Sequence, residues 1–123
     1  MVLGGKRVDS DNTLADYAAK ISYRVSKMNE ELNNMLFEES IIHDDIINLI
    51  DKHITELYEM INRLESFENI SLEISFHRDK LVRGINLEIK RHICIKNKFL
   101  ENKSDIDLSE CNEIAYEINK ILS

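Results

Sequence analysis

The sequence contains no proline, and it has only three glycines among its 123 residues. Because proline and glycine are the strongest turn and helix-breaking signals, their scarcity argues against a turn-rich β fold and predicts long, uninterrupted helices. No apolar run approaches the roughly 18 residues that are needed to span a bilayer. The first residues, MVLGGKRVDSDN, lack the hydrophobic core and the cleavage site of a signal peptide. We therefore expect a cytoplasmic protein with no membrane partner.

Cysteine is also scarce, with only Cys94 and Cys111 in the chain. Two cysteines at this spacing are too few for a disulfide framework or a zinc site, and we expect reduced, partly buried thiols. The sequence also lacks a Gly-rich phosphate loop, a nucleophile elbow and a CxxC pair. These absences predict a protein that binds rather than catalyses, with no catalytic residue, metal or cofactor.

The charge of the chain is unevenly distributed. The net charge is −7, yet residues 77–103 carry eight Lys or Arg against three Asp or Glu, a local charge of +5 that leaves −12 for the remainder. Such a basic segment either contacts phosphates or pairs with the acidic helices of its own chain. The second interpretation is favoured on the sequence alone.

The spacing of apolar residues predicts a first helix over residues 11–38, after a flexible N-terminal tail of residues 1–10, and a second helix over residues 40–67. Capping residues are available at both starts: Asp11, Asn12 or Thr13 for the first helix and Ser40 for the second. The apolar residues that step by three and four along one face are Leu14, Ala18, Ile21, Val25, Met28, Leu32 and Met35, then Ile47, Ile50, Ile54, Leu57, Ile61 and Leu64.

The second half of the chain is less regular. A helix is predicted over residues 71–83, with Gly84 as a natural stop. Residues 85–99 fit both a continued helix and a short extended segment, because their apolar residues match both periods. A last helix is predicted over residues 108–122, with Asp105 or Asp107 as its cap.

These elements predict an all-α fold, an antiparallel up-and-down bundle of four helices that forms a single domain over residues 11–123. The last helix is about half as long as the first two, so one end of the bundle is expected to be uncovered. Four aromatic residues fall towards that end: Tyr17, Tyr58, Phe67 and Phe76. An exposed aromatic groove there would bind a partner helix or a second copy of the chain, as in an adaptor or chaperone.

Residues 78–84 read RDKLVRG, and no other stretch comes as near to a chemical motif. This stretch resembles the signature of HEPN domains, small all-α proteins common in prokaryotic toxin–antitoxin and defence systems. The signature is an Arg, usually followed by Asn or Asp, and a His a few residues later, often with an aliphatic pair before the His and Gly after it. The residues that match are Arg78, Asp79, Leu81, Val82 and Gly84. Arg83 stands where the family has its His.

The resemblance implies a domain that dimerises and brings two copies of the motif together to cut RNA. Arginine stays protonated at neutral pH and cannot exchange the proton that this cleavage needs, so Arg83 implies a catalytically silent relative. Arg78, Asp79 and Arg83 would then contact RNA phosphate or an acidic protein partner. The first hypothesis is therefore a non-catalytic binding protein, dimeric and HEPN-like.

A third hypothesis is a metal-dependent enzyme. Glu is followed four residues later by His three times, at Glu39–His43, Glu73–His77 and Glu88–His92, and acidic pairs occur at Glu56 with Glu59 and at Glu110 with Glu113. On a helix each Glu–His pair shares one face, as metal ligands do. Local ion pairs, caps and a solvated acidic face explain both patterns, and His53 reads as a semi-buried residue rather than a ligand.

Overall fold

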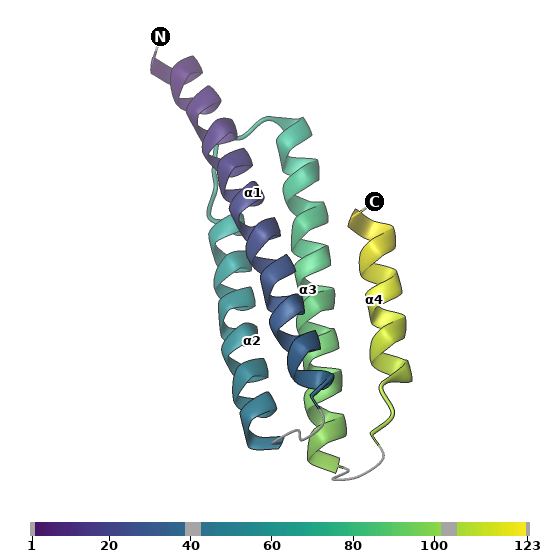
Figure 1. The fold of residues 1–123 in the computed structure, drawn as a ribbon. Helices are drawn as coiled ribbons and strands as arrows, with labels where there is room; N and C mark the ends of the chain where they lie inside the picture. The colour runs from purple at the N-terminus through teal and green to yellow at the C-terminus, as the bar shows by residue number, and fades with distance from the viewer. Residues whose placement is uncertain (1, 39–42, 102–105, 123) are drawn as a thin grey trace.

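The computed structural model describes residues 2–38, 43–101 and 106–122. Four helices occur in these ranges, with no strand among the described residues. They are α1 (Val2–Leu36), α2 (His43–Glu65), α3 (Leu72–Glu101) and α4 (Ser109–Leu122), and they run alternately down and up the molecule (Figure 1). The predicted all-α four-helix bundle is therefore confirmed. Within the described ranges, no helix combines the length and the apolar character that a membrane span requires.

The four helices do not pack equally. The first three pack against one another, whereas α4 packs along α3 alone (Figure 1). As predicted, α4 is short: in Figure 1 it lies beside the middle turns of α3 and leaves the upper turns free. The first turns of α1 project beyond the ends of the other helices.

The interior consists of two apolar clusters. The upper core contains Ile21, Met28, Leu57, Met60, Ile61, Leu64, Ile85 and Ile89. The lower core contains Leu32, Ile46, Ile50, Ile95, Phe99 and Cys111. Most members lie at the apolar positions that the spacing predicted. In a helix of 3.6 residues per turn, residues three and four apart share one face, so their spacing in the sequence indicates which side is buried. Each fully buried aliphatic side chain contributes roughly 1.5–3 kcal/mol to stability.

The predicted start of the first helix is wrong. The helix begins at Val2, so the three proposed capping residues lie within it. Residues 2–10 contain no proline, and their two glycines cost a helix only about 1 kcal/mol each, so nothing in them ends the helix. The side chain of Asp11 has another role, because its Oδ1 accepts a hydrogen bond of 2.8 Å from the backbone N–H of Ser71. The flexibility of residues 1–10 stays a prediction.

Gly84 does not stop α3, so that prediction is wrong. Of the two alternatives for residues 85–99, the continued helix is confirmed and the extended segment is wrong. The helix runs without a break from Leu72 to Glu101, and Gly84 is buried within it with a negative φ. Packing explains the difference, since four residues beyond the glycine belong to the two cores: Ile85, Ile89, Ile95 and Phe99. Burial of those side chains outweighs the cost of about 1 kcal/mol for one glycine.

The predicted start of the third helix, at residue 71, is close to the observed one. Ser71 caps α3, its Oγ accepting a hydrogen bond of 3.3 Å from the backbone N–H of Ile74, a role that was not predicted from the sequence. At the start of α4, the Asp107 carboxylate accepts a hydrogen bond of 2.6 Å from the Ser109 hydroxyl and one of 3.0 Å from the Ser109 backbone N–H, and these bonds, the hydroxyl bond first, lower the pKa of the Asp107 carboxyl. The other proposed caps, Ser40 and Asp105, lie outside the described residues.

The prediction of two reduced thiols is wrong. Cys94 of α3 and Cys111 of α4 form a disulfide, with their Cα atoms 5.7 Å apart. The sequence does not reveal this pair because its proximity arises only when α4 folds back along α3. The bond fastens α4 to the one helix against which it packs.

Candidate functional site

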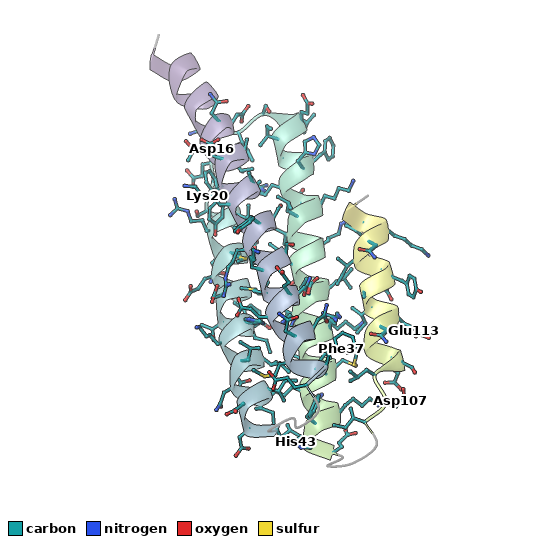
Figure 2. The ribbon with its side chains drawn as sticks, viewed as in Figure 1. Asp16, Lys20, Phe37, His43, Asp107 and Glu113 are labelled. Carbon is teal, nitrogen blue, oxygen red and sulfur yellow. A yellow bond between two sulfur atoms is a disulfide. The ribbon has the colours of Figure 1, made fainter. Side chains whose placement is uncertain are left out.

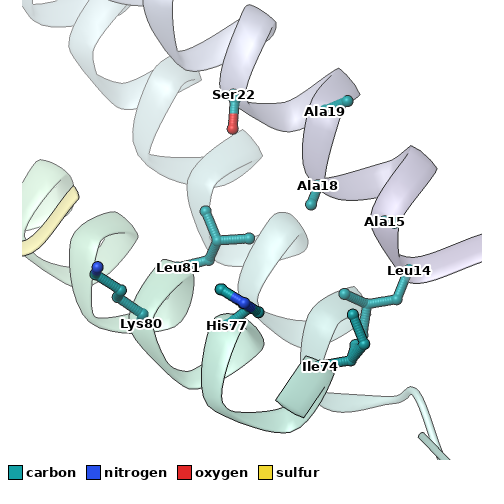
Figure 3. A pocket seen from close by; sticks show the side chains of 9 residues that line it. All are labelled: Leu14, Ala15, Ala18, Ala19, Ser22, Ile74, His77, Lys80 and Leu81. Atoms are coloured by element: carbon teal, nitrogen blue, oxygen red, sulfur yellow. The ribbon is translucent and has the colours of Figure 1, made fainter. Parts of the chain in front are cut away.

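An open groove of about 520 Å³ lies between the N-terminal halves of α1 and α3. Figure 3 shows the α1 side chains along one wall and the α3 side chains along the other. The lining residues are Leu14, Ala15, Ala18, Ala19 and Ser22 from α1, and Ile74, His77, Lys80 and Leu81 from α3. The groove is therefore mainly apolar, with two basic side chains on its α3 wall.

Small side chains explain why the groove exists. Between Leu14 and Ser22, α1 presents three alanines towards α3, and their methyl groups cannot fill the space between the two helices. The fourth helix, which would complete this side of the bundle, ends lower along α3 (Figure 1). A smaller apolar hollow adjoins the groove and shares two of its residues; it is lined by Ile21, Ser22, Val25, Leu81 and Ile85.

The four predicted partner-binding aromatics do not line this groove. Tyr17 and Phe67 lie together with their ring centroids 6.3 Å apart, and the guanidinium of Arg63 lies over both rings at 5.3 and 6.0 Å. Partial burial raises the pKa of the Tyr17 hydroxyl. Tyr58 and Phe76 are 50% and 66% exposed, and no described ring contact joins either to that pair. The uncovered end is thus present, but its groove is aliphatic.

The two arginines of the HEPN-like stretch have different surroundings in the structure. The guanidinium of Arg78 donates hydrogen bonds to the backbone carbonyl of Phe67 (3.2 Å) and to Ser75 Oγ (3.4 Å), so it fastens the α2–α3 connection to α3. It also lies 3.4 Å from the exposed carboxylate of Asp79. Arg83, one turn further along α3, is exposed. Of the two arginines, Arg83 is therefore the one with a guanidinium open to a partner.

A second cluster is polar and buried, and it lies between the two cores. His53 of α2 and His92 of α3 are 0% and 1% exposed, and His53 Nδ1 lies 3.1 Å from His92 Nε2. Asn29 of α1 joins the same layer, donating to Glu88 Oε1 (3.1 Å) and accepting from Arg91 Nη1 (3.4 Å). We name these five residues the polar layer. It connects all three helices of the core.

Burial shifts the acid–base behaviour of this layer. It lowers the pKa of His92 to about 4 and lowers that of His53, and it raises the pKa of the Glu88 carboxyl. Three buried atoms have no hydrogen-bond partner in the described structure: His53 Nε2, Glu88 Oε2 and Arg91 Nε. Such groups are costly, so the layer is maintained at the expense of some stability.

An ion-pair cluster borders the polar layer. Arg24 of α1 binds both carboxylate oxygens of Glu56 (2.8 and 2.9 Å) and one of Glu31 (2.7 Å). These bonds lower the pKa of both carboxyls. The second oxygen of Glu31 lies 3.5 Å from His53 Nε2. The sequence predicted that Glu56 belongs to a solvated acidic face together with Glu59. In the structure, Arg24 binds both oxygens of the Glu56 carboxylate.

The residues considered for a metal site do not converge. Among the described residues, no three His, Cys, Asp or Glu side chains are placed to hold an ion. In the Glu88–His92 pair, His92 Nδ1 lies 3.9 Å from the Glu88 carboxylate but 2.8 Å from the Glu88 backbone carbonyl. The Glu39–His43 pair includes a residue outside the described ranges.

Sequence reasoning found part of these sites. It placed an uncovered end correctly and it noted His53 and Glu88–His92 separately. It missed the contact between the two histidines, because residues on different helices and 39 positions apart give no local signal. It missed the groove because a run of alanines at helical spacing reads as ordinary helix.

Comparisons with protein-family models, with curated proteins and with solved structures found no match to this chain. The function must therefore be argued from the geometry of these sites.

Proposed function

We propose that this chain is a non-catalytic interaction module, and that the groove between α1 and α3 accepts an amphipathic helix of a partner protein. The observation that carries the proposal is the open apolar groove of about 520 Å³ beside the end of α4. A helix laid there would continue, along the upper part of α3, the packing that α4 provides further down that helix.

The lining suits a helix. Two helices approach closely, to interaxial distances of roughly 8–10 Å, where the side chains at their contact are small. The α1 wall offers three alanines and a serine for such an approach, while Ile74 and Leu81 offer larger apolar surfaces. A partner helix would insert side chains spaced i, i+3, i+4 and i+7 between them, as in other helix-in-groove complexes.

Charge indicates the chemistry of the partner. His77 and Lys80 lie on the α3 wall, and Arg83 is exposed on the same helix. No acidic side chain lines the groove. A helix with an apolar face and acidic residues beside that face is therefore complementary to the groove.

The test is direct binding of a model peptide. A labelled amphipathic peptide with leucine on one face and glutamate beside it is titrated with the protein, and its fluorescence anisotropy is measured. We expect saturable binding that Ala18→Glu weakens about tenfold or more, because the new carboxylate would be buried against leucine. Asn48→Glu, which adds the same charge on the exposed side of α2, should leave the affinity unchanged.

Two results would count against this function. One is equal binding by the wild type and the Ala18→Glu variant, which would place the peptide elsewhere. The other is preference for a matched peptide with lysine in place of glutamate, which would remove the charge argument.

The HEPN-like binding of RNA is the second candidate, and the exposure of Arg83 is the observation that favours it. It is tested with labelled total RNA at several salt concentrations, with binding and cleavage scored together. This candidate predicts salt-sensitive binding without cleavage, and its loss in Arg83→Ala. Arg78→Ala is a poorer probe, since that side chain holds the carbonyl of Phe67.

The predicted homodimer is part of both candidates. A second copy of the chain could occupy the groove, and two copies of Arg83 would be brought together in a HEPN-like pair. Sedimentation equilibrium of the wild type and of Ala18→Glu separates these cases. A dimer that dissociates in the variant would show that the partner helix belongs to a second copy.

A further inference from the structure

The two buried histidines form a hydrogen-bond chain with a fixed direction. The backbone carbonyl of Glu88 can only accept, so His92 Nδ1, 2.8 Å away, carries a proton. In a neutral ring the other nitrogen then carries no proton, so His92 Nε2 must accept a hydrogen bond. The donor to it is His53 Nδ1, at 3.1 Å. The Nε2 atom of neutral His53 is consequently a bare acceptor, and it is buried without a donor.

That bare nitrogen is where one additional proton fits. It faces the Glu31 carboxylate at 3.5 Å, and protonated Nε2 would donate towards it without disturbing the bond to His92. The neighbouring charges favour this step: Arg24 is positive, whereas Glu31 and Glu56 are both negative, which leaves the cluster one positive charge short. Lys52, which precedes His53 in the sequence, is exposed to solvent.

A second proton has no place in the same arrangement. On His92 it would sit at Nε2 and point at His53 Nδ1–H, so that two donors and two positive rings would meet at 3.1 Å. Arg91 adds a third positive charge to the α3 side of the layer. Glu88 does not balance these charges, because burial raises the pKa of its carboxyl and favours its neutral form in acid. Helix α4 packs on α3 alone, so the groups that surround the two histidines come from α1, α2 and α3.

We propose that the His53–His92 pair is a two-step acid switch: the first proton is held at His53 Nε2 against Glu31, and the second, at His92, breaks the contact between α2 and α3. The structure tolerates the first step, and the second separates α3, with α4 attached to it by the disulfide, from the other two helices. This inference does not depend on what occupies the groove.

The first test needs no variant. Nitrogen-15 spectra of the histidine rings are recorded from neutral pH to pH 4, with exposed His77 as the internal reference. At neutral pH both buried rings should carry their proton on Nδ1, with Nε2 bare. On acidification His53 Nε2 should change first, and the His92 ring should change only as the helices lose their ordered amide signals. Independent titration of both rings in an intact bundle would overturn the proposal.

The second test measures unfolding by urea as a function of pH. Each proton that the unfolded chain binds in excess of the folded chain lowers the folding equilibrium constant up to tenfold per pH unit. In His92→Gln the glutamine carbonyl can still accept from His53 Nδ1 but does not titrate. The decrease of the free energy of unfolding with falling pH should therefore become shallower by about one proton. His77→Gln, on the surface of the same helix, should keep the wild-type slope. Equal slopes in all three proteins would contradict a switch at His92.

Glu31→Gln isolates the first step. This side chain is partly exposed, so its replacement should preserve the fold. Glutamine keeps an oxygen that can accept from His53 Nε2–H but removes the negative charge that stabilises the protonated ring, so the first change in the ring spectra should move to lower pH. An unchanged first step would show that Glu31 does not hold the proton.

Discussion

The two ends of this bundle differ in what lies against α3. At the lower end α4 lies along α3 and is fastened by the disulfide, and Cys111 joins the core. At the upper end no fourth helix is present in the described structure, and α1 and α3 leave a groove. Helices of similar apolar pattern thus give a closed core at one end and an open apolar surface at the other. The end of α4 below this level and the three alanines of α1 together distinguish the candidate binding surface from the core.

The largest expected effect comes from truncating matched residues at the two ends. Ile50→Ala at the closed end should lower the free energy of unfolding by about 2–5 kcal/mol, because Ile50 is fully buried and a cavity remains. Leu81→Ala in the groove wall should cost about 1 kcal/mol, since solvent already reaches that side chain. Urea unfolding measures both. Equal losses would contradict the distinction between a closed end and an open end.

Reduction of the disulfide should make the closed end resemble the open one. The Cys94–Cys111 bond closes a loop of 17 residues, and a loop of that size is worth about 3 kcal/mol in the chain-entropy model. We expect the reduced protein to lose protection of the α4 amides against hydrogen exchange, while α1 and α2 keep theirs. Unchanged α4 protection in the reduced protein would show that packing on α3 alone holds this helix.

A smaller effect on stability is expected from filling the groove. Ala19→Leu adds apolar surface to a wall that has room for it, so stability should change by less than about 0.5 kcal/mol, as for other exposed positions. Binding of the acidic amphipathic peptide should nevertheless weaken. A loss of stability of several kcal/mol would mean that the space is already filled by packed side chains.

Phe37 offers a control for exposed apolar surface outside the groove. It lies at the lower end of α1 and is 85% exposed (Figure 2). Phe37→Ala should alter neither stability nor peptide binding. An effect on binding would indicate that the partner surface extends over the lower end as well.

The helices themselves were predictable because their apolar spacing is a local property. Leu14, Met28, Leu32, Leu57 and Leu64 are all buried where that spacing placed them. Boundaries and pairings were less accessible, since they depend on residues far apart in the chain. Gly84 reads as a stop until the burial of Ile85 and Ile89 against other helices is known.

The candidate sites were predicted only in outline. A short last helix correctly indicated an uncovered end, but the groove found there is lined partly by alanines and not by the four proposed aromatics, whose part in binding stays a prediction. The disulfide and the His53–His92 contact each join two helices, so neither spacing nor composition reveals them. Arg78 fitted a family motif, yet its guanidinium holds the carbonyl of Phe67, a contact that the motif does not predict.

Mapping the acidic amphipathic peptide onto the protein by amide chemical shifts tests the central claim most directly. If the groove between α1 and α3 is the binding surface, the shifts should concentrate on its two walls, residues 14–22 and 74–81, and disappear in Ala18→Glu. Shifts confined to α4 or to the outer face of α2, or shifts that persist in the variant, would contradict it.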